Sequence, residues 1–524
     1  MEAPRSADPH RGVIRLHRFH GGLELPDHKQ AAASRPVAGV PLPAQLVVPL
    51  AQHIGAAAKP CVEAGQSVLK GQPIGAPEGY VSVAVHAPTS GRVLAVEPRQ
   101  VPHPSGLTAP CVVIEPDGDE RWVERQPLDL DHLHVSEQRN RLRCAGIAGL
   151  GGAVFPTFIK LNPGTHHVRT LVVNGGECEP YISCDDALMR THPDEIIAGA
   201  EIARRLLGAD RVLIGIEDNK PAAIAAMQDA VRDAGLSFAV VPVPALYPAG
   251  GEKQLIYTLT GIEVPSGRRP QDVGLACFNV GTCRALFRAV RLGEPLVSRF
   301  VTVTGNVAEP RNFDVLLGTP VAHLAAQAQP LAGTDGYIMG GPMMGYRLPS
   351  ADVPVVKSTN CLIARSPALF PPQPAAMPCI RCGRCAEVCP ARLQPMELYA
   401  FAKSKNLGKA QEYDLFDCIE CGCCSYVCPS HLPLVDFYRY AKGEIWARER
   451  EKKAADLART RHEFRLERLQ REKDDRARRL AARTGAETQD DKASILETIE
   501  RAKAARQSAA VPAAEATTDD EPQR

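Results

Sequence analysis

Two copies of one cysteine spacing constrain this chain of 524 residues more than any other feature. They hold eight of its seventeen cysteines, with proline after the last cysteine of each copy: Cys379, Cys382, Cys385 and Cys389-Pro390, then Cys418, Cys421, Cys424 and Cys428-Pro429. Two residues between successive thiolates let a tight loop fold around a compact cube, and proline then ends the loop. This is the ligand spacing of [4Fe-4S] clusters, so the sequence predicts two of them.

The spacing also predicts which thiolates share a cluster. In the bacterial ferredoxin arrangement the first three cysteines of a run hold one cluster, and the fourth crosses over to the other. One predicted ligand set is therefore Cys379, Cys382, Cys385 and Cys428, and the other is Cys418, Cys421, Cys424 and Cys389. The two clusters must then lie close together. Cys423 falls outside the register and is predicted to be a packed thiol.

Structural zinc and a disulfide framework are the alternatives for these cysteines. Zinc sites usually take two Cys-x2-Cys pairs, whereas each run here has three cysteines in register and a fourth four residues later. The residues before Pro26 have no apolar core typical of a secretory signal. We therefore expect a reducing cytoplasm, where disulfides are rare.

Composition narrows the class of protein. The length allows about three to five domains, and a hydrophobic content of 44% is ordinary for globular chains. The formal net charge is +1, which gives no general case for binding nucleic acid. No apolar run reaches the roughly 18 residues of a membrane-spanning helix, so we expect none.

After an N-terminal segment, 1–39, the residues 40–116 are predicted to form short strands punctuated by glycine and proline. They resemble the flattened β-sandwich, or barrel-sandwich hybrid, of lipoyl and biotin carrier domains. A carrier needs an exposed lysine at its hairpin tip. Residues 79–86 offer no lysine there, and Lys70 lies in the preceding turn. We therefore predict a structural or docking module.

The remaining chain is predicted to be multidomain α/β. Alternating strands and helices in 117–297 predict a Rossmann-like domain with a mainly parallel sheet, whose ligands bind at the carboxyl ends of the strands. Residues 298–345 resemble a soluble-ligand-binding β-grasp module, and 346–440 hold the helical dicluster ferredoxin domain. Acid-before-base pairs predict a solvated charged helix over 441–483, with partner docking as the alternative. Composition predicts disorder over 484–524.

Four loops in the predicted α/β domain concentrate glycine, amide and carboxylate groups. The first, 146–160, contains four glycines at 146, 149, 151 and 152 and ends at Lys160. Glycines let the backbone approach a phosphate and lysine adds a counter-charge, although such a loop is often only a tight turn. The other three loops are Val173–Tyr181, Tyr247–Leu255 and Phe278–Thr282. Their order resembles the flavin-binding subunit of respiratory complex I, in which such loops surround FMN and NADH.

The resemblance implies a set of cofactor contacts. FMN would contact Gly149, Gly151, Gly152, Lys160, Asn174, Asn279 and Thr282, and the nicotinamide nucleotide would approach Glu177, Glu179 and Glu252. Phe155 and Phe158 would line the pocket or pack in the core. Cys178, Tyr181 and Lys253 stand where the family has a smaller residue, a glycine and a glutamate.

The domain order resembles the RnfC subunit of the Rnf electron transport complex, an ion-translocating ferredoxin and NAD oxidoreductase of bacterial membranes. The resemblance implies a peripheral subunit on the cytoplasmic face of the inner membrane, with integral-membrane and ferredoxin-like partner subunits. NADH delivers two electrons as a hydride and a cluster accepts one, so a flavin must divide the pair. No general acid, nucleophile or catalytic triad of the chain is needed. The alternatives are a flavin diaphorase subunit of a soluble hydrogenase or formate dehydrogenase, and a non-enzymatic electron-transfer adaptor.

Overall fold

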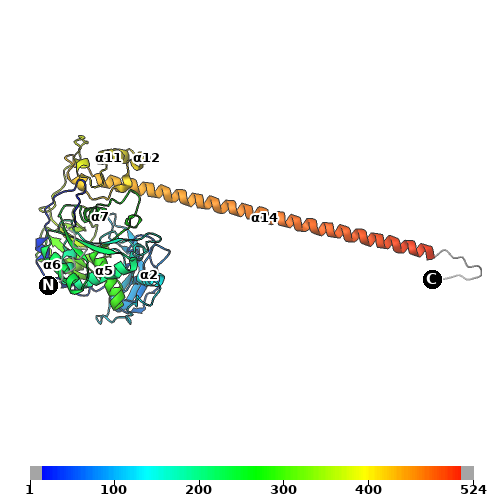
Figure 1. Cartoon of the computed structure of the whole chain (residues 1–524), viewed down its shortest axis with the longest axis horizontal. Coiled ribbons are helices and arrows are strands. Elements are labelled where there is room, and N and C mark those ends of the chain that lie inside the picture. Colours follow the sequence, from blue (N-terminus) through cyan, green and yellow to red (C-terminus); the bar gives the residue numbers. More distant parts are fainter. Residues whose placement is uncertain (1–13, 509–524) are drawn as a thin grey trace, which may run out of the picture. The chain divides into compact units, whose positions relative to one another are not determined.

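The computed structural model describes residues 14–508, so the start of the predicted N-terminal segment and the end of the predicted tail lie outside the described residues. The chain divides into two units between Lys442 and Gly443 (Figure 1). Within the described residues, no helix is both long and apolar enough to cross a membrane.

The barrel-sandwich module consists of two small sheets packed face to face. Its strands are β2 (Leu46–Pro49), β3 (Lys59–Pro60), β4 (Ser67–Val68), β5 (Pro73–Ala76), β6 (Val85–His86), β7 (Gly91–Gln100) and β8 (Thr108–Pro116). The sheet orders are β2-β8-β7-β4 and β3-β5-β6. Alternate residues such as Leu46, Ile74 and Ile114 point inward and form the core. Lys70 pairs with Glu120 at 2.6 Å and lies over the Trp122 ring.

The α/β domain has a parallel sheet of four strands in the order β11-β10-β9-β12. The strands are β9 (Thr170–Gly175), β10 (Arg211–Glu217), β11 (Ala239–Val243) and β12 (Leu275–Asn279). The helices are α2 (Val135–Cys144), α3 (Thr157–Lys160), α4 (Cys184–Thr191), α5 (Pro193–Leu207), α6 (Pro221–Asp233), α7 (Glu252–Thr260) and α8 (Val280–Phe287), with short turns at Pro270–Val273 and Arg288–Leu292. The strand order reverses between β9 and β12, which creates a topological switch point.

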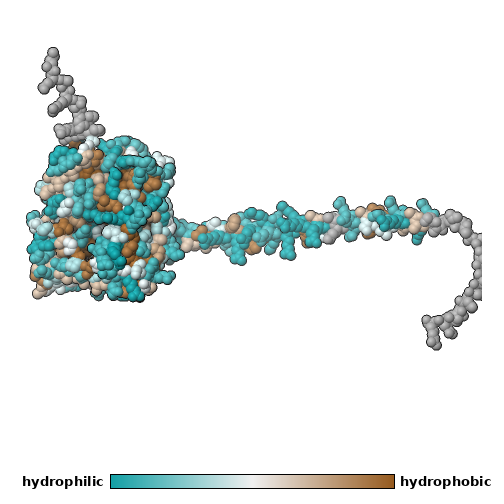
Figure 2. Space-filling model, turned by 90° about the horizontal axis from the view of Figure 1, so that it is seen from below, coloured by the Kyte–Doolittle hydropathy of each residue, from teal (hydrophilic) through white to brown (hydrophobic). Residues whose placement is uncertain are grey.

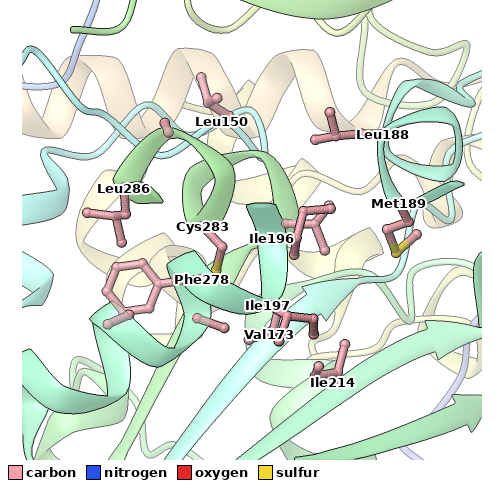
Figure 3. Packing of buried hydrophobic residues seen from close by; sticks show 14 of the residues in the cluster. Leu150, Val173, Leu188, Met189, Ile196, Ile197, Ile214, Phe278, Cys283 and Leu286 are labelled. Atoms are coloured by element: carbon pink, nitrogen blue, oxygen red, sulfur yellow. The ribbon is translucent and has the colours of Figure 1, made fainter. Parts of the chain in front are cut away.

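Both faces of this sheet are buried, which explains its nearly continuous apolar strands. Val173 and Phe278 face the core shared with α4, α5 and α8 (Figure 3). Val172 faces the opposite core, which contains α7. Helix α5 approaches α8 closely at Gly199, where a Cβ atom would lie 1.8 Å from the carbonyl oxygen of Cys283. A glycine is therefore needed at this crossing.

A mixed sheet of six strands follows, in the order β1-β14-β13-β17-β15-β16. Its elements are β1 (Ala38–Gly39), β13 (Ser298–Gly305), β14 (Arg311–Leu316), α9 (Val321–Ala326), β15 (Gly336–Met339), β16 (Tyr346–Arg347) and β17 (Cys361–Arg365). The long strands β13 and β17 lie side by side and parallel at its centre, as in a β-grasp.

Two domain limits differ from the sequence prediction. The predicted end of the β-grasp module at 345 cuts off β17, which pairs with both β13 and β15. The predicted N-terminal segment is not separate either, because β1 pairs with β14, and the short helix α1 (Gln30–Ala33) precedes it. Both pairings join residues far apart in the chain, so no local pattern marks them.

The cluster segment contains short helices between its cysteine loops. These are α10 (Arg384–Glu387), α11 (Pro395–Lys403), α12 (Leu407–Glu412), a 3-10 turn at Leu415–Asp417, α13 (Cys423–Tyr426) and the beginning of α14 (Leu434–Ser508). The order of elements repeats, because α10 carries Cys385, the third cysteine of the first run, as α13 carries Cys424 of the second.

The second unit is described as one helix, the part of α14 from Gly443 to Ser508. Its surface is mostly hydrophilic (Figure 2). The sequence predicts disorder from 484, whereas the helix continues to Ser508. The segment is rich in alanine, glutamate, lysine and arginine, which favour helix, and Glu497 pairs with Arg501 one turn later at 3.1 Å. The rest of the predicted tail lies outside the described residues.

Candidate functional site: two cysteine cavities and a nucleotide switch point

The structure gathers the eight predicted ligands around two small cavities. One cavity is lined by Cys379, Cys382, Cys385 and Cys428. The other is lined by Cys389, Cys418, Cys421 and Cys424. These are the two sets that the crossing rule predicts, with the fourth cysteine of each run facing the other run's cavity. We call them the first cavity and the second cavity.

Backbone geometry at both cavities suits thiolate ligands. Arg381 and Glu420, one residue before the second cysteine of each run, adopt left-handed φ angles of 54° and 58°. This turn lets the N–H of Arg381 donate to Cys379 Sγ at 3.4 Å, and the N–H of Glu420 donate to Cys418 Sγ at 3.4 Å. Hydrogen bonds to cluster sulfurs favour the anionic ligand and tune the potential. The residues present therefore fit iron-sulfur clusters.

Two further features concern the second cavity. Burial raises the pKa of the Cys418 thiol to about 11, so cluster binding there must release a proton. Cys423 is fully buried and also lines this cavity. The sequence predicts a packed thiol at Cys423, and the burial agrees with that prediction.

The loops of the α/β domain meet at the switch point. Asn174, the next-to-last residue of β9, lies beside Asn279, its register partner at the end of β12. The Asn174 side chain donates to the Gly250 carbonyl at 2.8 Å and accepts from the Gly176 N–H at 2.9 Å. Asn279 caps α8 by accepting from the Gly281 N–H at 2.9 Å. The two amides thus hold the loops on which a flavin would lie.

The glycine loop crosses the same edge of the sheet. Gly151 and Gly152 are exposed. A Cβ at Gly151 would lie 3.3 Å from Asn279 Cβ, and Gly152 has a φ of 103° that disfavours other residues. The loop is anchored because the Leu150 N–H donates to Thr282 Oγ1 at 2.9 Å. Thr282 is buried and supports the glycine loop through this hydrogen bond. This exposed glycine edge fits the close approach of FMN.

A half-buried ion pair lies beside the glycine loop. Lys160 Nζ pairs with Glu252 at the start of α7 and donates to the Cys277 carbonyl at 3.2 Å. Burial alone would lower the pKa of Lys160, but the charge and hydrogen bond of Glu252, together with the electrostatic effect of Cys277, outweigh burial and raise it. The lysine is therefore cationic at neutral pH, as a counter-charge for a phosphate must be.

The two glutamates of the β9 loop are bound within the protein. Glu177 is buried and accepts from the Asp185 N–H at 2.8 Å, at the start of α4. Glu179 accepts from the N–H groups of Met343 and Met344, both at 2.8 Å. Burial raises the pKa of Glu179 despite these bonds. Phe155 is half-buried, and Phe158 is buried against Val83 of the barrel-sandwich module.

Three residues at this site were missed by sequence reasoning. Lys29 reaches from the N-terminal segment and donates to the carbonyls of Glu179 at 3.0 Å and Ile182 at 2.7 Å. Asp185 accepts from the Asn279 side chain at 2.6 Å, and burial raises its pKa to about 7. Tyr247 donates to the Cys421 carbonyl at 2.6 Å. Each contact joins distant segments, although an acidic first turn of α4 was visible at Asp185.

Tyr247 places the second cavity next to the loop Tyr247–Leu255 of the α/β domain. It belongs to the loop that leads into α7, and it is buried with Cys421 and Cys423 in one apolar cluster. Leu23 and Met343 pack against that cluster. The nucleotide domain therefore contacts the cavity of Cys389, Cys418, Cys421 and Cys424 directly.

Comparison with known proteins agrees with this geometry. Residues 17–119 match the RnfC barrel sandwich hybrid domain, 142–288 match the Nuo51 FMN-binding domain, and 378–432 match a 4Fe-4S dicluster domain. The C subunit of the ion-translocating oxidoreductase complex of Yersinia pestis biovar Antiqua is 47% identical over 462 residues, which cover 87% of this chain and 74% of the relative. The chain belongs to this RnfC family.

The corresponding C subunit of Pseudomonas aeruginosa is 48% identical over 466 residues, which cover 88% of this chain and 60% of the relative. The chain thus spans less than two thirds of several RnfC relatives. Among solved structures, an NAD+-reducing [NiFe]-hydrogenase is 20% identical with a TM-score of 0.41, over 53% of this chain and 54% of that one. Membership of the RnfC family confirms the predicted resemblance, the predicted fold class, and FMN and [4Fe-4S] clusters as cofactors.

Proposed function

We propose that the chain exchanges electrons between NAD(H), FMN and two [4Fe-4S] clusters, as a peripheral subunit of a membrane-bound Rnf-type complex that moves ions. It would lie on the cytoplasmic face of the inner membrane and bind integral-membrane and ferredoxin-like subunits. The observation that carries the proposal is the hydrogen bond from Tyr247 to the Cys421 carbonyl at 2.6 Å. It joins a flavin loop to a cysteine cavity without intervening solvent.

The proposed work of the chain is to bind and orient its cofactors. FMN, when bound, takes a two-electron hydride and releases electrons singly. Gly149, Gly151 and Gly152 would leave room for the flavin phosphate and ribityl chain, while Lys160 would supply positive charge. Asn174 and Asn279 would hold the loops beneath the ring, with Thr282 anchoring the glycine loop.

The glutamates would shape the side on which the nicotinamide nucleotide approaches. Glu252 is held by Lys160 and is half-buried, so part of its side chain stays accessible to a nucleotide. Glu177 and Glu179 would fix the loop after β9 through the amides that they accept from. The eight cysteines would hold the two clusters in the two sets described above.

The test is anaerobic reduction by NADH of the full chain after cluster and FMN reconstitution. Flavin bleaching followed by a low-temperature electron paramagnetic resonance signal of reduced clusters is the expected result. Flavin bleaching without a cluster signal would indicate a diaphorase whose flavin does not pass electrons to its clusters. A chain that holds its clusters but takes up no flavin would be an adaptor, and either result contradicts the proposal.

A further inference from the structure

The two cysteine runs are repeats of one loop, yet their surroundings differ. The loop Cys379–Gly383 corresponds to Cys418–Gly422, and the glycine that ends each has a φ of 81°. Ile419 of the second loop packs into the apolar cluster around Tyr247. Its counterpart Ile380 is 67% exposed, and the neighbouring Met377 is 63% exposed. The loop Cys418–Gly422 is therefore covered by protein, and we call it the covered loop. Its repeat, Cys379–Gly383, is exposed, and we call it the bare loop.

The covered loop shows what kind of surface fits this motif. Ile419 packs in a cluster with Leu23, Tyr247 and Met343, which come from the N-terminal segment, the α/β domain and the β-grasp module. Tyr247 donates one hydrogen bond to the Cys421 carbonyl at 2.6 Å. Contact is close, because a Cβ at Gly422 would lie 2.8 Å from the Met343 carbonyl oxygen. In the repeat, a Cβ at Gly383 would meet nothing within 4 Å. The bare loop thus has the shape of a docking site that this unit's own chain does not fill.

Charge distinguishes the two loops further. Glu420 in the covered loop pairs with Arg439 and Lys442, both at 2.9 Å. The bare loop has Arg381 in that position. Arg381, Arg384 and Arg392 are all exposed, and none of them forms an ion pair with any residue from 14 to 508. The bare side is therefore cationic as well as apolar, and the ligands Cys379 and Cys382 reach its surface.

We propose that this first-repeat face, formed by Met377, Ile380, Arg381, Arg384 and Arg392, docks an acidic one-electron carrier protein. The carrier places its metal centre over the first cavity, and its carboxylates surround that centre. The inference rests on the proposed function and adds the face and the charge of the partner. In each encounter one electron crosses the face, so one side is oxidised by one electron and the other is reduced by one. No bond forms or breaks.

Physical reasons favour this occupant. Unpaired arginines attract a carrier with negative charge and raise its association rate at low salt. The apolar centre of Met377 and Ile380, rimmed by arginines, has the composition of a docking patch. Because two cysteine ligands lie at the surface, a docked centre comes close to the cluster that they would hold.

The experiment uses the full chain with clusters and FMN, and a plant-type [2Fe-2S] ferredoxin as the acidic probe. Calorimetry measures its affinity at low and high salt, with cytochrome c as a basic probe. The variants are Ile380→Glu and Arg384→Glu. The matched controls lie on the barrel-sandwich module: Leu107→Glu, at a side chain 54% exposed, and Arg92→Glu, at an exposed arginine.

We expect each face variant to weaken ferredoxin binding at least about tenfold, and each control to leave it unchanged. Binding of the wild-type chain should weaken with salt and exceed that of cytochrome c. Equal loss in face and control variants, no ferredoxin binding, or preference for cytochrome c overturns the proposal. So does sedimentation showing that Ile380→Glu only separates a dimer, which would assign the face to a second copy.

The two proposals fail separately. If the wild-type chain with its cofactors passes electrons from NADH to its clusters but ferredoxin does not bind the first-repeat face, only the docking inference is contradicted. If NADH reduces no cluster in that chain, the proposed function is lost whatever ferredoxin does. Cluster content, measured as iron and acid-labile sulfide, must match between variants and wild type for the binding comparison to count.

Discussion

Lys357 lies in an environment that is unusual for a lysine. Its side chain is 1% exposed and has no carboxylate partner among the described residues. Nζ donates to the Gly146 carbonyl at 2.7 Å and the Ala84 carbonyl at 3.3 Å. It thereby ties the barrel-sandwich module to the beginning of the glycine loop. A buried amine held only by carbonyls carries a desolvation cost whenever it is charged.

This environment makes stability depend on pH. Burial lowers the pKa of Lys357 from 10.5 to about 7. Between those values the unfolded chain keeps a proton that the folded chain has lost, so the free energy of unfolding rises with pH by up to about 1.4 kcal/mol per unit. Lys357→Met should remove that rise, and the exposed control Lys59→Met should keep it. Thermal midpoints across this range measure it, and an unchanged slope in Lys357→Met contradicts the assignment.

Adjacent cysteines in the second cavity have different predicted roles. Cys424 belongs to the predicted ligand set, and Cys423 does not. Cys424→Ser should therefore lower iron from about eight to about four atoms per chain, because one cluster loses a ligand. Cys423→Ala should keep about eight. Iron and sulfide analysis after anaerobic reconstitution decides between them. Equal iron loss in the two variants would show that Cys423 is a ligand.

Among the elements, we expect the glycine loop and the strand ends beside it to determine flavin binding. Gly152→Val puts a branched side chain on the exposed edge where the flavin phosphate would approach, and should abolish FMN binding. Gly164→Val is a matched control, since Gly164 also has a positive φ, 65°, and open space around it. Flavin fluorescence after release from the purified chain measures the content. Full FMN in Gly152→Val would show that the loop is only a turn.

Local patterns explain what the sequence predicted at this scale. The cysteine spacing is a local property, so both ligand sets could be assigned before any fold was known. The strand β9 was visible as an apolar run ending in Asn174, whereas β12 was not predicted and its last residues were assigned to the loop Phe278–Thr282. By contrast, β17 was missed because its partners β13 and β15 precede it by more than twenty residues. The helix beyond 484 was missed because composition was weighed without its helix propensity.

At the scale of the first unit, Tyr247 connects the α/β domain to the second cavity. It is 3% exposed, and its hydroxyl donates to the Cys421 carbonyl. Tyr247→Phe leaves that buried carbonyl unpaired, at a cost of about 1–3 kcal/mol. We expect faster amide hydrogen exchange in 418–424, with no change at 379–385. Tyr80→Phe, at a side chain 62% exposed, is the control. Unaltered exchange at 418–424 would show that this hydrogen bond does not stabilise the second cysteine loop.

Contacts between domains could not be predicted from the sequence. Lys29, Tyr247 and Lys357 each join segments more than a hundred residues apart. Nothing in their neighbours distinguishes them from surface lysines or an ordinary core tyrosine. The family resemblance predicted the cofactors and the loops that would hold them. The structure shows which of the cavities, loops and β modules contact one another.

The cofactor content of the full chain, purified anaerobically, tests the central claim most directly. Iron, acid-labile sulfide, zinc and flavin are measured on the same sample. The account predicts about eight irons and eight sulfides, one FMN and no zinc per chain. Zinc in place of iron, or a full set of iron without flavin, would contradict it.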